Sequence, residues 1–189
     1  MRDRVGIIAI QGDIEAHAAA LEECGAEPVR VLHAHQLGDL HALIVPGGES
    51  TTIAKGLARL GLAEPLHGFA ESGRPLLGTC AGAILLSRAS RNHPVPTLGL
   101  IDAVALRNAY GTQVDSFAAV CDPGGAFDAL RCIFIRAPRL AELGPAVETL
   151  VRVDGDPVLL RDGNVLAATF HPELTEDRRV HELLLAPKG

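Results

Sequence analysis

Short apolar runs alternate with amphipathic stretches through the first half of the chain. The apolar runs are typical of strands buried on both faces of a sheet, and they cover residues 5–10, 28–32, 42–45 and 75–79. The amphipathic stretches predict helices over residues 13–24, 50–60, 65–72 and 81–88. Asp13 is placed to cap the first helix, and Gly25 ends it. This alternation predicts a parallel sheet with helices on both faces.

The second half shows a different pattern. Strands without long intervening helices are predicted over residues 98–107, 114–120, 130–135, 148–153, 157–161 and 165–170. Asp154-Gly155 and Asp162-Gly163-Asn164 are hairpin signals, and residues 175–185 are predicted to form a closing helix. The expected fold class is α/β, a doubly wound and mostly parallel sheet of the flavodoxin-like kind, with antiparallel strands added to its edge by the second half. No linker divides the chain, so we expect residues 1–189 to form a single domain.

The composition narrows the classes of function. The 189 residues carry 17 Lys and Arg against 23 Asp and Glu, so the formal net charge is −6, and 3% of the residues are aromatic. An acidic chain with few aromatic rings lacks the positive surface and the stacking platforms of a nucleic-acid-binding protein. No apolar run approaches the roughly 18 residues of a membrane-spanning helix. We therefore expect neither a nucleic acid nor a membrane as partner.

The four cysteines are at positions 24, 80, 121 and 132, and they form no C-x-x-C pair and no metal-binding spacing with histidine. We expect reduced thiols in a cytoplasmic protein without a bound metal or cofactor. The segment Gly78–Gly82 reads G-x-C-x-G between a predicted strand and a predicted helix, which is the thiol version of a nucleophile elbow. Such a turn exposes the Cys80 thiol at the carboxyl edge of the sheet, and it places the N–H of Ala81 to stabilise an oxyanion. The other three cysteines are expected to be small buried apolar residues.

A nucleophilic cysteine needs a histidine, and the histidine needs a carboxylate to orient it. Among the eight histidines, His171 follows the last predicted strand and is separated from Glu173 only by Pro172. In an extended segment, residues i and i+2 point to the same side, so His171 and Glu173 are placed to interact. The alternative is a surface histidine beside a surface glutamate. The other seven histidines look like solvated positions.

The glycine-rich segment Pro46–Thr51 follows the third predicted strand at the same edge of the sheet. Gly47 and Gly48 can adopt positive φ angles and expose N–H groups, so this loop can bind an anion or supply a second oxyanion donor. It is not a Walker A loop, because the G-K-[ST] step is absent. The alternative is a tight turn followed by a helix N-cap at Ser50 or Thr51.

Together, the elbow and the His171–Glu173 segment resemble a class I (Triad) glutamine amidotransferase. Further motifs resemble those of the glutaminase subunit of pyridoxal 5′-phosphate synthase, and these are Ala9–Gly12, Pro46–Thr51, Gly78–Leu85, Arg107–Gly111 and Phe134–Pro138. The resemblance spans nearly the whole chain, with the motifs in the same order. Thr112 departs from it, because the family commonly carries Arg or Ser at that position.

The resemblance implies a glutaminase that hydrolyses L-glutamine to L-glutamate and ammonia. Cys80 would be the nucleophile, and His171 and Glu173 would complete the triad. The ammonia would pass to a synthase partner, within a large hetero-oligomer, that builds pyridoxal 5′-phosphate from a pentose phosphate and a triose phosphate. The expected substrate-binding residues are Gly47, Gly48, Glu49, Ser50, Ala81, Arg107, Ile135 and Arg136.

The chemistry of these residues agrees with a glutamine site. The α-carboxylate of glutamine needs a cation such as Arg107 or Arg136, and its ammonium needs an acceptor such as Glu49. The alternative for each arginine is a surface salt bridge. The Gly47-Gly48 peptide can rotate at little steric cost, and Gln11, at the end of the first strand, is placed to hold the loop or the partner. We therefore predict that the partner activates the glutaminase.

Three alternatives stay open. One is a glutaminase that serves another ammonia-using synthase. Another is a cysteine hydrolase or deglycase on a similar scaffold, although the His-Pro-Glu segment after a late strand favours the amidotransferase. The third is a flavodoxin-like module that binds phosphate at Pro46–Thr51, which the scarcity of aromatic residues to cover a flavin disfavours.

Overall fold

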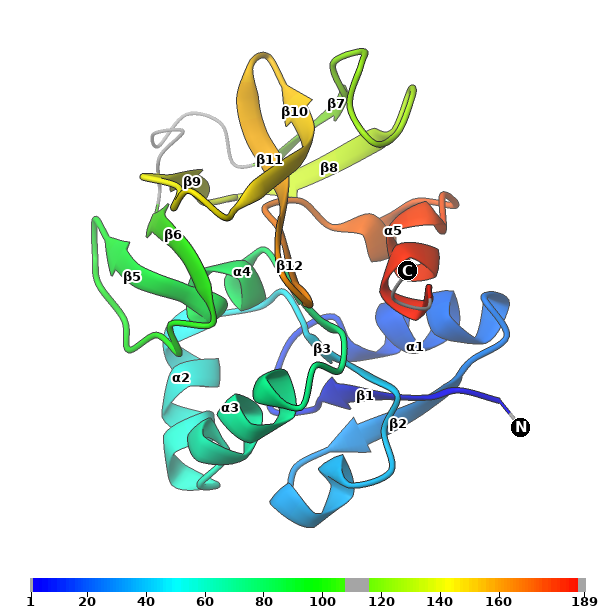
Figure 1. Cartoon of the computed structure of the whole chain (residues 1–189), viewed down its shortest axis with the longest axis vertical. Coiled ribbons are helices and arrows are strands. Elements are labelled where there is room, and N and C mark those ends of the chain that lie inside the picture. The colour runs from blue at the N-terminus through cyan, green and yellow to red at the C-terminus, as the bar shows by residue number, and fades with distance from the viewer. Residues whose placement is uncertain (1, 108–115, 187–189) are drawn as a thin grey trace.

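The computed structural model describes residues 2–107 and 116–186. Seven strands form a central sheet in the order β10-β11-β12-β4-β3-β1-β2 (Figure 1). Their bounds are β1 Arg4–Ile8, β2 Glu27–Val31, β3 Ala42–Val45, β4 Leu76–Thr79, β10 Glu148–Val153, β11 Asp156–Asp162 and β12 Val165–Ala168. The strands from β12 to β2 are parallel, and β11 and β10 add antiparallel pairs at one edge. The predicted mostly parallel sheet with added antiparallel strands is confirmed.

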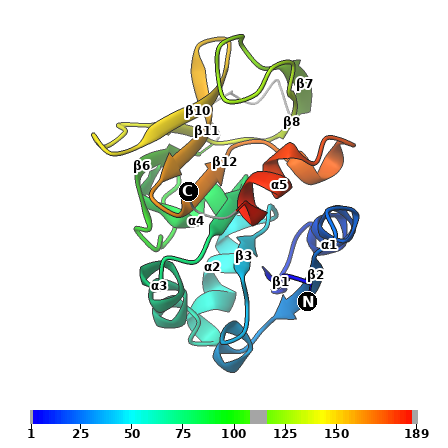
Figure 2. The ribbon, with the colours of Figure 1, turned by 45° about the vertical axis from the view of Figure 1, so that its right-hand side comes forward.

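Helices cover both faces of this sheet (Figures 1 and 2). They are α1 Ile14–Glu23, α2 Ser50–Arg59, α3 Ala63–Glu71, α4 Ala81–Leu86 and α5 Arg179–Leu185, with short 3-10 turns η1 Ala34–Leu37 and η2 Pro172–Leu174. Successive residues of β1 explain why its apolar run is continuous. Ile7 packs with Leu21 of α1 and Leu184 of α5, whereas Ile8 packs in the core of the opposite face, which contains Leu57 of α2 and Phe69 of α3.

Two small sheets lie outside the central sheet. One contains β5 Ser87–Arg91, β6 Ile101–Leu106 and β9 Arg139–Ala141, and the other pairs β7 Ser116–Val120 with β8 Arg131–Ile135. The expectation that residues 98–107, 114–120 and 130–135 extend the central sheet is therefore wrong; residues 114 and 115 lie outside the described residues. Cys132 and Phe134 of β8 are buried in the core beside α5, while their neighbours on the strand are not. An antiparallel pair can bury one face and leave the other in solvent, and β7 and β8 form such a two-stranded sheet.

Helix α4 is shorter than predicted, because the chain becomes extended at Ser87. The Ser87 hydroxyl donates to the carbonyl oxygen of Ala83 at 2.8 Å, and such a bond back into the preceding turn competes with continued helix. The next residues form β5, a strand that the apolar pattern did not predict, because its burial is discontinuous.

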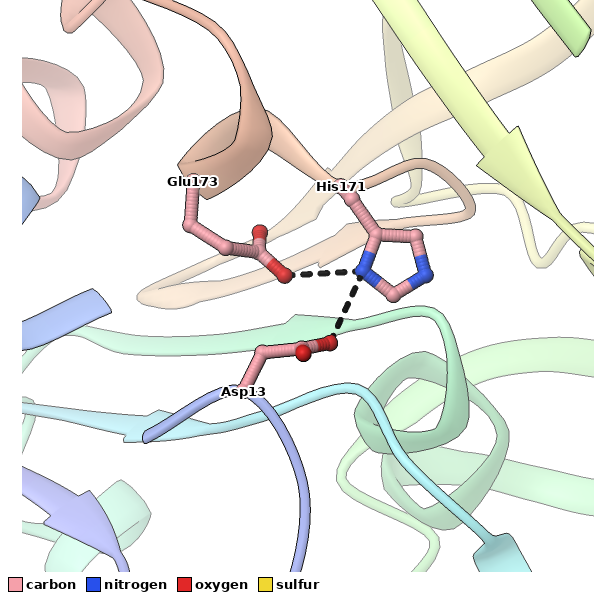
Figure 3. A group of neighbouring side chains, drawn as sticks. All are labelled: Asp13, His171 and Glu173. Atoms are coloured by element: carbon pink, nitrogen blue, oxygen red, sulfur yellow. Dashed lines mark hydrogen bonds and ion pairs between the residues drawn. The ribbon is translucent and has the colours of Figure 1, made fainter. Parts of the chain in front are cut away.

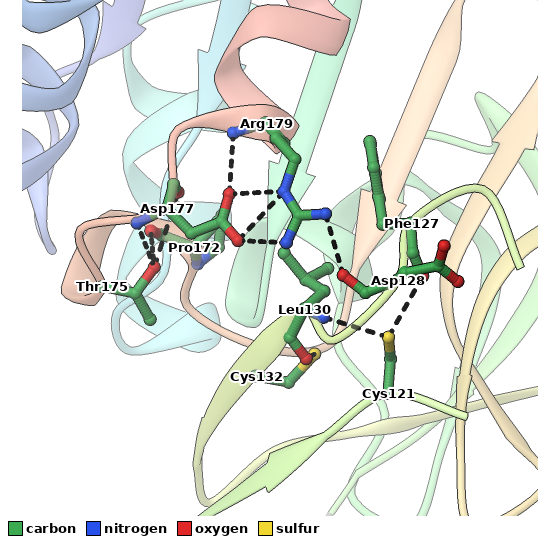
Figure 4. A network of polar contacts seen from close by, with 9 residues as sticks. All are labelled: Cys121, Phe127, Asp128, Leu130, Cys132, Pro172, Thr175, Asp177 and Arg179. Carbon is green, nitrogen blue, oxygen red and sulfur yellow. Dashed lines mark hydrogen bonds and ion pairs between the residues drawn. The ribbon is translucent and has the colours of Figure 1, made fainter. Parts of the chain in front are cut away.

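The closing helix also begins later than predicted, at Arg179 instead of Thr175. Thr175 has extended backbone angles, and its hydroxyl accepts the N–H of Asp177 at 3.2 Å. The Asp177 carboxylate then accepts the N–H of Arg179 at 3.1 Å. Arg179 also donates to the carbonyl oxygen of Asp128 at 2.9 Å, which ties this segment to the loop between β7 and β8 (Figure 4). Side-chain bonds to the backbone thus replace the first helical turn.

Gly82 is required where α4 passes close to the end of β3. A Cβ atom at Gly82 would lie 1.9 Å from the backbone oxygen of Val45, so the backbone would have to move. We expect Gly82→Ala to lower the free energy of unfolding by about 3 kcal/mol. The matched control is Gly68→Ala in α3, where a Cβ meets nothing within 4 Å and alanine stabilises a helix by up to about 1 kcal/mol. Urea unfolding measures both changes, and equal stability of Gly82→Ala and the parent would contradict the packing argument.

Candidate active site

Four neighbouring parallel strands end at one edge of the sheet, and the candidate residues lie just beyond them. β1 leads to Gln11 and Asp13, β3 to the glycine loop Gly47–Glu49, β4 to Cys80, and β12 to His171. Adjacent strands in the order β12-β4-β3-β1 bring these segments together. A cavity of about 500 Å³ lies there, at the edge where doubly wound sheets bind ligands.

Most of the predicted site residues line this cavity. They are Gln11, Gly48, Glu49, Ser50, Cys80, Ala81, Arg107, Ile135, Arg136 and His171. The predicted residues Gly47 and Glu173 do not line it, but they adjoin Gly48 and His171. The wall also includes Asp13, Ile84 and Pro138, which the sequence motifs did not single out as site residues.

Cys80 occupies the turn between β4 and α4, with φ 47° and ψ −102°. These angles are disfavoured for a residue with a Cβ atom, and such strain is common at active sites. Its N–H donates to the carbonyl oxygen of Ala168 at 2.8 Å, and its Sγ lies 3.7 Å from the carbonyl oxygen of Ile135. The expectation of an exposed thiol is wrong, since Cys80 is only 7% exposed; it faces the cavity rather than open surface.

His171 and Glu173 form the contact that their spacing predicts. Nδ1 of His171 lies 2.8 Å from Oε1 of Glu173 (Figure 3), although Glu173 stands in the η2 turn rather than in extended chain. The backbone N–H of His171 donates to Ile133 at 2.8 Å, which ties the segment to β8. Nε2 of His171 points away from Glu173, and it is buried without a hydrogen-bond partner in the described part of the chain.

The electrostatics of this pair favour a charged imidazole. Burial lowers the pKa of His171, but its interactions with Cys80 and Glu173 outweigh burial and raise that pKa to about 10. Burial raises the pKa of Glu173, against the opposing effect of His171. His171 is therefore protonated at neutral pH and ready to act as a general acid.

Asp13 is a further carboxylate at the same ring. Its Oδ2 lies 3.3 Å from Nδ1 of His171, and its side chain is 39% exposed, whereas that of Glu173 is fully buried (Figure 3). The expectation that the Asp13 side chain caps α1 is wrong, because it makes no capping bond. Asp13, like Gln11, follows the end of β1, and this position at the site edge was the available signal.

A metal site needs at least three His, Cys, Asp or Glu side chains whose ligand atoms lie close together. Within the described residues, the only such group is Asp13, His171 and Glu173, whose ligand atoms all lie within 4.8 Å of one another. The 2.8 Å separation of Nδ1 and Oε1 is that of a hydrogen bond, in which the ring proton occupies the position that a metal would take. The expectation of a metal-free site stays a prediction.

The glycine loop packs directly against His171. The N–H of Gly47 donates to Oγ1 of Thr79 at 3.0 Å, and its carbonyl oxygen accepts the N–H of Asp13 at 3.2 Å. A Cβ at Gly47 would lie 2.6 Å from Cε1 of His171. Gly48 has a φ of +153°, which is unfavourable for other residues. Gly47 is thus needed for the close approach of the loop to His171, and Gly48 is needed for its own backbone conformation.

Gln11 and Glu49 fix the far side of the loop. Oε1 of Gln11 accepts the N–H of Glu49 at 2.7 Å, so Gln11 contacts the loop; its role in holding the loop or the partner stays a prediction. Helix α2 begins at Ser50 as predicted, but its cap is Glu49 rather than Ser50 or Thr51. The Glu49 carboxylate accepts the N–H groups of Thr51 and Thr52, and the hydrogen bond from the Thr52 side chain is the main cause that lowers its pKa to about 2.

Arg107, Ile135 and Arg136 form another part of the wall. Arg107 donates to the carbonyl oxygen of His93. Arg136 is exposed and has a φ of 43°, and it follows Ile135, whose carbonyl oxygen contacts Cys80. The rest of the Arg107–Gly111 motif, together with Thr112, lies outside the described residues.

Two histidines contradict the expectation of solvated positions. His17 and His181 are both fully buried, because α1 and α5 pack against each other over the sheet. Helical periodicity predicted a buried face for α1, but it did not show that a histidine on that face is hydrogen-bonded to the site.

The geometry defines a class of protein. A cysteine in a strand-to-helix elbow, beside a histidine and a glutamate after the adjacent strand, characterises the class I glutamine amidotransferases that the sequence resembles. A solved structure described as a glutamine amidotransferase superimposes with a TM-score of 0.90 and 45% identity, over 96% of each chain. The structure of PurLQS from Thermotoga maritima has the same fold, with a TM-score of 0.69 and 21% identity over 98% of each chain.

The chain belongs to the SNO glutamine amidotransferase family, whose model matches residues 7–187. It is 44% identical over 191 residues to pyridoxal 5′-phosphate synthase subunit PdxT of Halorubrum lacusprofundi, covering 98% of this chain and 97% of the relative. It is 48% identical over 185 residues to the subunit of the same name from Frankia casuarinae, covering 96% and 93%. The resemblance drawn from the sequence motifs is confirmed.

Proposed function

We propose that this protein is a glutaminase that hydrolyses L-glutamine to L-glutamate and ammonia through Cys80, His171 and Glu173. The observation that carries the proposal is the His171–Glu173 hydrogen bond behind a strained cysteine that faces a cavity. Membership of a glutamine amidotransferase family supports glutamine as the substrate. We also propose that residues 1–189 form one catalytic domain.

The first half-reaction forms a thioester. The Cys80 thiolate attacks the side-chain amide carbon of glutamine, and the carbonyl oxygen becomes an oxyanion. The N–H of Ala81, in the first turn of α4, has no partner within the helix and is placed to stabilise this oxyanion. The His171 imidazolium gives its proton to the amide nitrogen, the C–N bond breaks, and ammonia leaves.

The second half-reaction restores the enzyme. Neutral His171 takes a proton from water as the water oxygen attacks the glutamyl thioester. The C–S bond breaks, glutamate leaves, and Cys80 is again a thiolate beside protonated His171. Glu173 holds Nδ1–H throughout, so Nε2 is the nitrogen that exchanges the proton.

Charged residues on the wall fit the zwitterionic part of glutamine. The guanidinium groups of Arg107 and Arg136 suit the α-carboxylate. The Glu49 carboxylate suits the ammonium, and it remains ionised because hydrogen bonds to α2 lower its pKa. Gly48, Ser50 and Ile135 then offer backbone contacts along the same wall.

The partner is inferred from the relatives. Both relatives above are named as subunits of pyridoxal 5′-phosphate synthase, so we propose that the ammonia passes to a synthase subunit that makes pyridoxal 5′-phosphate, within a large hetero-oligomer. No helix in residues 2–107 or 116–186 is long and apolar enough to cross a membrane. The four free cysteines support a cytoplasmic setting.

Glu173, rather than Asp13, is expected to be the carboxylate of the triad. Glu173 is closer to Nδ1 and fully buried, whereas Asp13 is partly solvated and its charge is screened. We expect Glu173→Gln to lower kcat by about 10³-fold or more, and Asp13→Asn to lower it by less than about threefold. Steady-state glutamate release measures both. The reverse order would assign the role to Asp13.

The glycine loop is proposed to control activity. In the structure, the Gly47 carbonyl oxygen is bound to the N–H of Asp13, so rotation of the Gly47-Gly48 peptide would break this bond and turn an N–H toward the site. One oxyanion donor changes turnover by about 10²- to 10³-fold. We therefore expect low activity of the isolated chain and stimulation by the synthase of about 10²-fold or more.

Two substitutions test this control. Gln11→Ala removes the bond to the N–H of Glu49 and is expected to reduce the stimulation about fivefold. Gly48→Ala is expected to reduce it further, since a Cβ there would lie 2.6 Å from Gln11 Oε1 at an unfavourable φ. Gly38→Ala, where the nearest neighbour is 3.8 Å away, is the control. Full activity of the isolated parent chain, unchanged by the synthase, would refute the gate and leave the triad untouched.

The competing functions are separated by one assay. Glutamate release from glutamine, measured with and without the synthase subunit, supports the glutaminase. A cysteine hydrolase or deglycase on this scaffold would leave glutamine intact, and a flavodoxin-like module would bind flavin and be yellow. A glutaminase for another synthase would release glutamate but gain nothing from the subunit that makes pyridoxal 5′-phosphate.

A further inference from the structure

A buried chain of polar side chains lies behind the triad, on the side away from the cavity. Nδ1 of His17 in α1 lies 3.0 Å from Nε2 of His181 in α5. Nε2 of His17 lies 3.1 Å from Oγ1 of Thr79 at the end of β4 and 3.4 Å from Oε2 of Glu173. These four side chains are at most 5% exposed. In both views of the ribbon, α1 and α5 are neighbours (Figures 1 and 2), and the η2 turn, which contains Glu173, contacts α1.

Both histidine rings are neutral, so each carries one N–H. Burial lowers the pKa of His17 well below its ordinary value, and the neighbouring His181 and His171 lower it further. Burial, with a smaller effect of Arg178, lowers the pKa of His181 to about 4. The direction of the hydrogen bonds between the rings therefore depends on which nitrogen of each ring holds its proton.

The unpartnered Nδ1 atom of His181 decides the direction of the hydrogen bond between His17 and His181. Nδ1 of His181 is buried without a hydrogen-bond partner in the described part of the chain, and a bare acceptor is tolerated there better than an orphaned donor. We therefore assign the proton of His181 to Nε2, which donates to Nδ1 of His17. The proton of His17 is then on Nε2, where it faces Thr79 and Glu173. The opposite arrangement would aim a ring lone pair at the Glu173 carboxylate.

Glu173 needs such a donor. Its Oε1 accepts from His171, but its buried Oε2 makes no hydrogen bond within ordinary limits in the described residues. We propose that His17 is a positioning residue of the triad: its Nε2–H faces Oε2 of Glu173 and keeps Oε1 turned toward Nδ1 of His171. The inference rests on the proposed function, since it specifies how that triad is held.

The same ring is linked to the glycine loop. Oγ1 of Thr79 faces Nε2 of His17 and also accepts the N–H of Gly47 at 3.0 Å. His17 thus contacts the carboxylate of the triad directly and the proposed oxyanion loop through one hydroxyl. A histidine that merely fills the core would have no such effect on turnover.

The test compares two residues of similar length at position 17, in the complete complex with the synthase and with L-glutamine as substrate. His17→Gln keeps an N–H close to the position of Nε2, and His17→Met has none. We expect His17→Met to lower kcat by about 10- to 100-fold with KM unchanged, and His17→Gln to recover at least about a third of the parent turnover.

His67→Asn in α3 is the control for loss of a histidine far from the site. Thermal unfolding is measured for each, and His17→Asn, which retains a buried amide but does not reach as far as Nε2, replaces His17→Met if that variant does not fold.

A double-mutant cycle separates positioning from general loss of structure. In a Glu173→Gln background, His17→Met is expected to reduce kcat by less than about twofold, because the carboxylate that it positions is gone. Full turnover of His17→Met, equal losses for the Gln and Met variants, or a full additional loss in the double variant would each overturn the inference. A parent complex that releases no glutamate would instead overturn the proposed function.

Discussion

Cys80→Ala is expected to abolish glutamine hydrolysis, with kcat reduced by about 10⁴-fold or more, while the chain stays folded. Without the sulfur no thioester forms, and the remaining residues only polarise the substrate. The side chain faces the cavity, and its Sγ lies 3.7 Å from the carbonyl oxygen of Ile135, so its loss removes little packing. Glutamate release in the presence of the synthase measures the effect.

The backbone at Cys80 gives this prediction a second readout. Its φ of 47° and ψ of −102° are unfavourable for any residue with a Cβ atom. Cys80→Gly is therefore expected to be as inactive as Cys80→Ala but more stable than the parent by about 1 kcal/mol. Cys24→Ser, at a partly exposed position outside the site, is expected to retain activity. Substantial turnover by Cys80→Ala would remove the cysteine from the mechanism.

His171→Asn is the second substitution with a very large expected effect, a loss in kcat of about 10⁴-fold or more. Asparagine can retain a polar group near Nδ1, but it has no atom at Nε2 that can give a proton to the leaving ammonia and take one from water. The loss should be strongly non-additive with that of Glu173→Gln, because the two residues act as one unit. Additive losses would show that they act separately.

The pH profile tests the same residue. Burial lowers the pKa of His171, but Cys80 and Glu173 raise it to about 10, so the imidazolium persists well above the pH at which an ordinary histidine loses its proton. We expect kcat/KM to stay high through neutral pH and to fall as the pH rises through about 10, where the proton needed by ammonia is lost. A fall near pH 6.5 would show that Cys80 and Glu173 do not hold this proton.

Sequence reasoning located the site because the relevant information is local. The apolar runs that become β1, β3, β4 and β12 are each followed directly by a chemically distinctive segment. Parallel strands bring their carboxyl ends to one edge, so the elbow at Cys80, the glycine loop and the His171–Glu173 segment had to lie near one another. Their roles as nucleophile, base and orienting carboxylate remain predictions for the assays above.

The features that sequence reasoning missed depend on long-range packing. Asp13 follows β1 at the site edge, but Asp before a helix is also a favourable cap, so the local sequence does not decide between capping α1 and turning toward His171. The small sheet of β5, β6 and β9 forms because α4 ends early and because β6 pairs with β9, a strand more than 30 residues away in the sequence. His17 looks solvated because the α1 segment around it is rich in Ala and Glu. Its burial depends on α5, which is more than 150 residues away in the sequence.

The most direct measurement of the central claim is covalent labelling of the complex by an electrophilic chloroketone analogue of glutamine, followed by peptide mass spectrometry. We expect one equivalent of label on Cys80, protection by L-glutamine, and loss of glutamate release in proportion to labelling. Cys24, Cys121 and Cys132 should remain unlabelled, since none of them lines the cavity. Label found chiefly on one of these three, or full glutaminase activity with Cys80 labelled, would contradict the assignment of Cys80 as the nucleophile.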